Sequence, residues 1–374
     1  MVKFSERVTP GIRGLQPYLP GKPSEEVERE LGLRNIVKLA SNESPLGPGR
    51  LAREAIARVA ADVSRYPDAN GFYLKQRLSE IHGVPPECLT LGNGSNDVLD
   101  IVARCFVLPE DEIVYAQYGF VVFGVTASAL SARPIVVPAR DWGHDLEAMA
   151  AASGERTRLV YVANPNNPTG TWNTSEALEH FLRHLPDHVV AVVDQAYAEY
   201  VEREDYPDCI GWLERFPNLV VTRTFSKVHG LAGVRIGYAV SHPEIADYMN
   251  RVRHPFNVNS IGLAAARAAL DDVEHVARSV EINRTGMVYV SAELRKLGLH
   301  SIPSIANFVT VDLERPARPV FDALLREGVI VRPVANYGMP NHLRITIGLP
   351  EENSRCIAAL SQVLAATRDP GFEK

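Results

Sequence analysis

The sequence has few cysteines, and their spacing suggests neither a disulfide framework nor a metal site. Cys88, Cys105, Cys209 and Cys356 are scattered through the 374 residues and form no C-x-x-C pair. Such spacing argues against structural zinc and against disulfide cross-links, and it fits a reducing compartment. We therefore expect no metal centre.

Long apolar runs and an excess of positive charge are also missing. The longest uncharged segment, residues 119–132, is too short to cross a bilayer, and the amino terminus lacks the apolar stretch of a signal peptide. The formal net charge of -6 leaves no basic surface for nucleic acid or anionic lipid. We expect a cytoplasmic protein whose partners include neither nucleic acid nor a membrane.

What the chain does contain is an alternation of apolar runs with helical periodicity, which is typical of an α/β protein. Up to about residue 260 the expected strands are buried ones, and we assign them to residues 89–91, 112–115, 135–137, 159–162, 189–193 and 219–223. Later segments predict helices at 261–270, 276–297 and 356–366 and strands at 307–311, 329–331 and 342–347. We expect an amino-terminal arm (1–45), a large domain with a mostly parallel central sheet flanked by helices (46–260), and a smaller α+β domain (261–374).

Lys227 lies just past the carboxyl end of one of these strands, where open α/β sheets place their ligands. Thr224, Ser226 and Arg235 are close to it in the sequence. One amine, two hydroxyls and an arginine suit a cofactor that carries an aldehyde and a phosphate, such as pyridoxal phosphate. The competing interpretation is a surface lysine in an ordinary glycine-rich loop.

Two more strands lead into polar residues. Asp194 ends the apolar run 189–193, and a carboxylate there is suited to hold a pyridine nitrogen protonated, with Tyr197 bonding the ring oxygen. A turn or helix cap explains Asp194 equally well on spacing alone. Asn167 follows the strand at 159–162 within a turn rich in asparagine and proline, and most such turns are only turns.

The segment after residues 89–91 predicts an anion-binding helix start. Ser95 and Asn96 precede an amphipathic pattern, so backbone N–H groups there are suited to bind a phosphate. A dinucleotide fingerprint is disfavoured because Gly92-x-Gly94-x-x-Asp97 lacks the third glycine. Tyr118, after the next strand, is a candidate to stack on a planar ring, although an aromatic there is more often part of a core. Motifs of P-loop enzymes, zinc proteases and serine hydrolases are absent.

Together these segments resemble the fold-type I pyridoxal-phosphate aminotransferases, and within them the histidinol-phosphate aminotransferase family. The resemblance covers nearly the whole chain, and it is carried by residues 38–47, 65–68, 92–97, 166–170, 194–197, 226–235 and 341–346. One departure is Gln195, where the family often has glutamate, and we expect it to leave the chemistry unaffected.

The resemblance implies a role for each matched residue. Lys227 would be the Schiff-base lysine, and Asp194 the partner of the pyridinium nitrogen. The remaining cofactor ligands it implies are Asn167 and Tyr197 at the ring oxygen, Tyr118 on the ring face, and Ser95, Asn96, Thr224, Ser226 and Arg235 at the phosphate. Tyr66 would reach that phosphate from a neighbouring subunit, which implies a homodimer with shared sites. The implied substrate residues are Tyr18, Asn42, Arg332 and Arg344, with both arginines directed at the anionic end.

The implied reaction is transamination between histidinol phosphate and 2-oxoglutarate. The nearest alternative is an aminotransferase of the same fold acting on phenylalanine or tyrosine. A pyridoxal-phosphate decarboxylase or lyase acting on an O-phosphorylated amino acid is a further one. A ligand-sensing regulator of this fold would need an appended DNA-binding domain. We do not expect one, because the family match begins within the first twenty residues.

Overall fold

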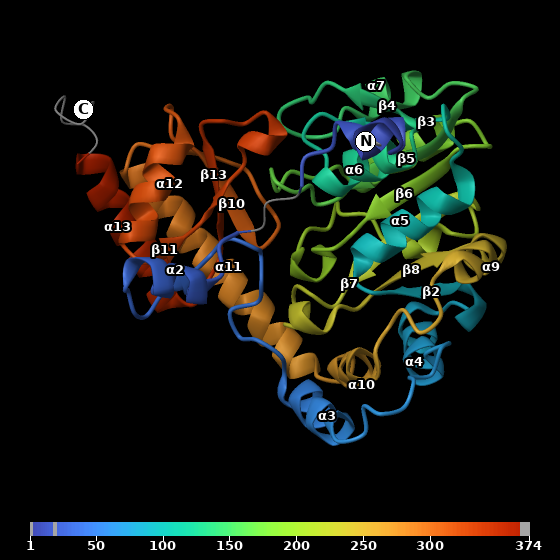
Figure 1. Ribbon diagram of the computed structural model, residues 1–374, viewed down its shortest axis with the longest axis horizontal. Helices are drawn as coiled ribbons and strands as arrows, with labels where there is room; N and C mark the ends of the chain where they lie inside the picture. Colours follow the sequence, from blue (N-terminus) through green and yellow to red (C-terminus); the bar gives the residue numbers. More distant parts are fainter. Residues whose placement is uncertain (1–2, 18–20, 367–374) are drawn as a thin grey trace.

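The computed structural model describes residues 3–17 and 21–366, and a seven-stranded sheet forms its centre (Figure 1). The strand order is β2-β8-β7-β6-β5-β3-β4. Only β8 runs antiparallel to its neighbours, so the sheet is mostly parallel, as predicted. The bounds are Leu89–Gly92 (β2), Glu112–Ala116 (β3), Arg133–Val137 (β4), Thr157–Ala163 (β5), Val190–Asp194 (β6), Leu219–Thr224 (β7) and Gly237–Ser241 (β8).

All six strands expected in this region are present. The prediction missed β8, because its sequence Gly-Tyr-Ala-Val-Ser has small residues and follows a glycine-rich stretch. β8 lies between β2 and β7 in the sheet. The segment that contains Lys227 connects β7 to β8, so both of its ends are anchored in the sheet.

Alternating side chains of the sheet enter two separate hydrophobic cores. Val221 and Val193 pack in one core, whereas Val220 and Val192 pack in the other. This is the period-two pattern of a sheet covered on both faces. On the first face lie α3 (Arg50–Ala60), α4 (Phe72–His82), α7 (Leu146–Ala151), α8 (Ser175–His184) and α10 (Ser260–Ala269). On the second lie α5 (Ser95–Phe106), α6 (Val121–Ala129) and α9 (Pro243–Val252).

A second, antiparallel sheet lies beside the seven-stranded sheet and its helices, at the left of Figure 1. Its order is β12-β13-β10-β9, with bounds Arg332–Pro333, His342–Thr346, Phe308–Asp312 and His300–Ile302. The helices around it are α11 (Val273–Lys296), α12 (Ala317–Arg326) and α13 (Pro350–Ala366). β9, β12 and α12 were missed by the prediction, and α13 begins six residues earlier than expected.

The amino-terminal segment joins this second part. Short helical turns at Phe4–Glu6 (η1) and Pro10–Arg13 (α1) precede α2 (Ser24–Leu31), and β1 (Val37–Lys38) pairs in parallel with β11 (Val329–Ile330). Val27, Val37 and Leu39 belong to the same core as the buried face of β13. The division at residues 45 and 260 stays a prediction, and α10 contributes Ala265 and Ala266 to the first core.

Candidate functional site

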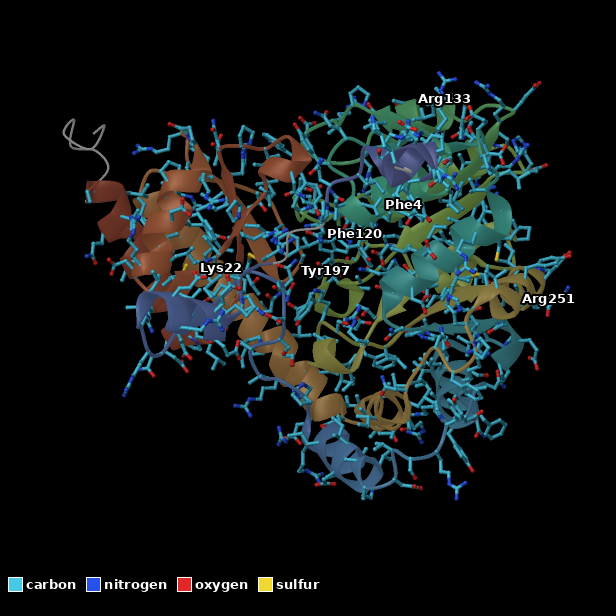
Figure 2. The ribbon with its side chains drawn as sticks, viewed as in Figure 1. Phe4, Lys22, Phe120, Arg133, Tyr197 and Arg251 are labelled. Atoms are coloured by element: carbon cyan, nitrogen blue, oxygen red, sulfur yellow. The ribbon has the colours of Figure 1, made fainter. Side chains whose placement is uncertain are left out.

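A cavity of about 290 Å³ lies where the two parts meet, and it gathers most of the predicted site residues. Phe120 and Tyr197, both labelled in Figure 2, are among its lining residues. Strands β5, β6 and β7 end at the cavity, and α5 begins there. The predicted residues that line it are Asn42, Ser95, Asn96, Asn167, Asp194, Tyr197, Thr224, Ser226, Lys227, Arg235, Arg332 and Arg344.

Lys227 lies three residues beyond the end of β7, as expected. Its Nζ donates a hydrogen bond to the carbonyl oxygen of Ser41 at 3.1 Å, and it lies 5.5 Å from the ring centroid of Tyr197. Burial lowers the pKa of Lys227 to about 7, and the positive charge of Arg344 acts in the same direction. A lysine with such a pKa is available as a neutral amine near neutral pH, which a nucleophile or base requires.

Asp194 is the last residue of β6 and is buried. Thr222 donates its hydroxyl to Oδ1 of Asp194 at 2.7 Å. Burial raises the pKa of Asp194 to about 6, and the Thr222 hydrogen bond and the Lys227 charge oppose that rise. No helix begins at Asp194, since the next turn, Ala198–Tyr200, has Tyr197 at its cap. The arrangement therefore provides a buried carboxylate suited to a cationic partner. The side chain of the next residue, Gln195, forms hydrogen bonds with Pro207 and Arg223.

Tyr197 and Asn42 are joined across the cavity. Nδ2 of Asn42 donates to the Tyr197 hydroxyl at 2.9 Å, and Oδ1 of Asn42 accepts from Thr346 at 3.1 Å. The backbone of Asn42 has a φ of 54°, a left-handed conformation that asparagine tolerates better than most residues. Burial raises the pKa of Tyr197 to about 12, so its hydroxyl stays protonated and able to donate.

The start of α5 and Arg235 form a compact anion-binding site. Nη1 of Arg235 donates to the carbonyl oxygen of Ala232 at 3.0 Å and approaches Oγ of Ser226 at 3.5 Å. A Cβ at Gly94 would lie 2.3 Å from Nη2 of Arg235, and one at Gly237 would lie 2.4 Å from the backbone nitrogen of Ser95. Gly237 is required because the atoms it approaches are backbone, and Gly94 because its φ of 86° disfavours a side chain. Free helix N–H groups, hydroxyls and a guanidinium at one point fit a phosphate group.

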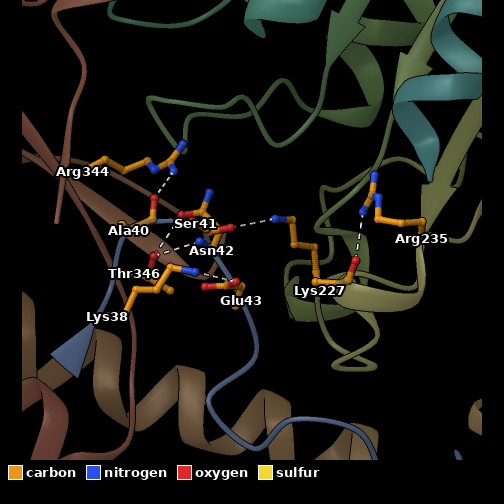
Figure 3. A network of polar contacts seen from close by, with 10 residues as sticks. Lys38, Ala40, Ser41, Asn42, Glu43, Lys227, Arg235, Arg344 and Thr346 are labelled. Atoms are coloured by element: carbon orange, nitrogen blue, oxygen red, sulfur yellow. Dashed lines mark hydrogen bonds and ion pairs between the residues drawn. The ribbon is translucent and has the colours of Figure 1, made fainter. Parts of the chain in front are cut away.

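The opposite wall of the cavity carries Arg332 and Arg344. The two residues are in register on β12 and β13, so their side chains lie next to one another. Arg344 is buried and donates to Oδ1 of Asn167 at 2.5 Å and to the carbonyl oxygen of Ala40 at 2.7 Å. Figure 3 shows Arg344 and Lys227 approaching residues 40–42 from opposite sides. This wall is therefore strongly cationic, and it suits an anionic group on a substrate.

Two predicted site residues do not line the cavity, and a third cannot be located because it falls outside residues 3–17 and 21–366. Tyr118 stacks on Trp142 with ring centroids 5.2 Å apart, and Phe120 lines the cavity in its place. Tyr66 is 82% exposed and stacks on Phe256. Tyr18 lies outside the described residues.

The prediction also missed lining residues that the structure brings in. Phe120 had a recognisable signal, because it is an aromatic immediately before α6 at a strand-to-helix connection. Tyr337 and Glu43 are side chains in loops and had none. Ser41 acts through its backbone oxygen, which any residue supplies.

Residues 3–17 and 21–366 contain neither a metal-binding cluster nor a membrane-spanning helix. No cluster of three or more histidine, cysteine, aspartate or glutamate side chains is arranged to hold a metal ion there. No helix in that part of the chain is both long and apolar enough to cross a membrane.

Comparisons with known proteins place this fold and cavity in a class. The family model for aminotransferase class I and II matches residues 34–360, so the chain belongs to that class. Histidinol-phosphate aminotransferase 1 of Nitrosococcus oceani is 54% identical over 98% of this chain and 99% of its own. Histidinol-phosphate aminotransferase 2 of Pseudomonas aeruginosa is 54% identical over 98% of this chain and all of its own. Within the class, the chain belongs to the histidinol-phosphate aminotransferase family.

A solved structure agrees with this assignment. The histidinol-phosphate aminotransferase of Sinorhizobium meliloti, crystallised in complex with pyridoxal-5'-phosphate, is 33% identical. It superposes with a TM-score of 0.89 over 96% of this chain and 98% of its own. The expected fold class, fold-type I aminotransferase, is confirmed.

Proposed function

We propose that this protein uses pyridoxal phosphate to transfer an amino group from L-histidinol phosphate to 2-oxoglutarate, giving imidazole-acetol phosphate and L-glutamate in histidine biosynthesis. The observation that carries the proposal is the cavity itself. It places a lysine of lowered pKa and a buried carboxylate opposite a pair of arginines. The names of relatives that are 54% identical over nearly the whole chain support the choice of substrate.

The residues of the cavity fit pyridoxal phosphate at each of its ends. Ser95, Asn96, Thr224, Ser226 and Arg235 would hold the phosphate, because they surround the close approach permitted by Gly94 and Gly237. Asp194 would accept a hydrogen bond from the protonated pyridine nitrogen. Asn167 and Tyr197 would bond the ring oxygen, and Phe120 would contact the ring face. Bound in this way, the cofactor supplies an aldehyde that accepts an amino group and a ring that takes up electron density.

Lys227 would act both as the group that binds the aldehyde covalently and as the base. With a pKa of about 7, about half of the amine is neutral at pH 7, and this form can remove a proton from the substrate carbon and return one elsewhere. The hydrogen bond from Thr222 favours the charged form of Asp194, which would hold the ring nitrogen in its protonated form. The two substrates then react in turn at one site, and we expect ping-pong kinetics.

Arg332 and Arg344 would serve both substrates. A guanidinium can bond a carboxylate or a phosphate through two parallel N–H groups. The same pair can therefore bind the α-carboxylate of glutamate in one half-reaction and the phosphate of histidinol phosphate in the other. Asn42, held by Thr346 and bonded to Tyr197, would contact the substrate between them.

We further propose a homodimer in which Tyr66 enters the partner's cavity. The support is that Tyr66 is almost fully exposed and lies outside the cavity of its own chain. Mixing inactive Tyr66→Ala chains with inactive Lys227→Ala chains should restore activity, since each mixed dimer contains one site with neither change. If subunits exchange and no activity returns, a tyrosine shared between subunits is excluded.

We place the reaction in the cytoplasm. The supporting observation is that all four cysteines are free thiols, three of them buried, as expected in a reducing compartment.

Two measurements test the proposed function. Borohydride treatment of the yellow holoenzyme should fix the chromophore to the peptide that contains Lys227, and a label on another lysine would overturn the assignment. Steady-state comparison should then give a higher kcat/KM for histidinol phosphate than for phenylalanine. The reverse preference would make the protein an aromatic amino acid aminotransferase.

A further inference from the structure

Thr222 interrupts an apolar pattern at a fully buried position next to the site. Val220, two residues earlier on β7, packs in the core on the same face of the sheet. Thr222 continues that face with no exposed surface. Burying a hydroxyl is unfavourable unless it forms a hydrogen bond, and valine has nearly the same shape. The hydroxyl therefore needs a specific partner.

That partner is Asp194. The two residues are in register on neighbouring parallel strands, so their side chains point to the same face. The Thr222 hydroxyl donates to Oδ1 of Asp194 at 2.7 Å, and both residues are buried. A strand-to-strand contact of this kind ties the side chain of Asp194 to the sheet itself.

Three other groups favour the charged form of Asp194, and two of them, Lys227 and Arg223, are less suited to hold it through a reaction. They are the Lys227 charge, the backbone N–H of Ala196 and the Arg223 charge. Lys227 itself reacts, so its charge changes. Arg223 is engaged elsewhere, because its two terminal nitrogens donate to Glu199 and Gln195. The Thr222 hydroxyl, by contrast, bonds Asp194 directly.

We propose that Thr222 is a positioning residue, which acts through Asp194 to keep that carboxylate oriented and charged toward the cofactor's ring nitrogen. This inference rests on the proposed function, because it assigns Asp194 the role described there. It adds a residue that does not line the cavity.

The first test compares binding and turnover. Thr222→Val keeps the shape and removes the donor, so the apoprotein should bind pyridoxal phosphate about ten- to a hundredfold more weakly, the scale of a hydrogen bond to a charged group. The kcat should fall by a similar factor with little change in KM. Thr222→Ser should restore both quantities.

Thr90→Val is the matched control, since Thr90 is equally buried in the same sheet and its hydroxyl bonds Ala246 instead. It should leave cofactor affinity and kcat unchanged. If Thr222→Val does not fold, Thr222→Ser and Thr222→Ala provide the same comparison, because both lack the methyl group and only one keeps the hydroxyl.

The second test does not depend on turnover. Burial raises the pKa of Asp194 to about 6 in the folded protein. The contribution of Asp194 to stability therefore declines as the pH rises from the ordinary pKa of an aspartate to about 6. Without the Thr222 donor the folded pKa rises further, and the decline should continue to higher pH. Thermal unfolding of the apoprotein should therefore show Thr222→Val losing stability above pH 6 relative to wild type, and Thr222→Ser should not.

The outcomes separate this inference from the proposed function. If wild type is active and Thr222→Val matches it in cofactor affinity, kcat and pH dependence, Thr222 has no positioning role. If Thr222→Val is impaired and Thr222→Ser is equally impaired, the role is packing and the inference is overturned. If wild type shows no transamination and no chromophore on Lys227, the proposed function itself fails.

Discussion

The half of the cavity that holds Lys227 and Asp194 comes from the ends of parallel strands, whereas the half that holds Arg332 and Arg344 comes from an antiparallel sheet. We call these the lysine half and the arginine half. In the lysine half each functional side chain lies at or just beyond the end of a strand. In the arginine half Arg344 lies in the middle of β13, and it reaches the cavity because the strand's other face is buried. One half is thus positioned by where strands end, and the other by which way a strand faces.

The largest expected effect concerns the lysine half. Lys227→Ala should reduce turnover by about 10⁴-fold, because covalent attachment and proton transfer are lost together. Binding of pyridoxal phosphate should survive through the groups around Arg235. Absorbance titration of the apoprotein measures the binding, and single-turnover kinetics measure the loss. A variant that keeps its full rate would remove Lys227 from the chemistry.

A smaller effect is expected in the arginine half. Arg344→Lys keeps the charge and loses the planar pair of donors, so kcat/KM should fall about ten- to a hundredfold, or about 1.5–3 kcal/mol. The loss should be equal for glutamate and histidinol phosphate. Arg332→Lys should cost less, because Arg332 is only partly buried. Loss for one substrate alone would show that the two anions use different sites.

The two halves should also be coupled electrostatically. The positive charge of Arg344 helps to lower the pKa of Lys227, so Arg344→Met should raise it. Lys227 must be neutral to attack an aldehyde. The rate at which the apoprotein combines with pyridoxal phosphate should rise through pH 7 in wild type and at higher pH in Arg344→Met. Stopped-flow absorbance across this range measures both profiles, and identical profiles would mean that the halves act independently.

The smallest effect distinguishes two neighbouring aromatics. Phe120 lines the cavity and Tyr118 stacks on Trp142, so Phe120→Leu should weaken cofactor binding about two- to tenfold, the scale of one aromatic contact. Tyr118→Leu should change the cofactor's dissociation constant less. A fluorescence titration measures both dissociation constants. If Tyr118→Leu weakens cofactor binding more than Phe120→Leu, Tyr118 is the residue that stacks on the ring, as the sequence first suggested.

The comparison also explains which features were predictable from sequence. Apolar runs ending in polar residues identify the lysine half, because parallel strands bring their carboxyl ends to one edge. The strand expected at 342–347 is present, and its alternation puts Leu343, Ile345 and Ile347 in the hydrophobic core and Arg344 on the opposite face. That Arg344 then faces Lys227 required the packing of two parts that are far apart in sequence. β8 was missed because its residues are small, whereas Phe120, an aromatic at a strand-to-helix connection, could have been recognised.

The backbone of residues 40 and 41 gives the site an unusual pattern of tolerance to mutation. Their carbonyl oxygens accept from Arg344 and Lys227, and such oxygens are present whichever side chain is attached. Selection can therefore act on the length and course of this segment while leaving the identity of Ser41, which is only partly buried, comparatively unconstrained. Ala40 is limited to a small side chain because it packs in a hydrophobic core. In a library of variants, single replacements at Ser41 should survive, whereas deleting or inserting one residue there should abolish growth that depends on the enzyme. The segment is thus constrained in geometry more than in composition, a signature that comparison of residue identities alone does not show.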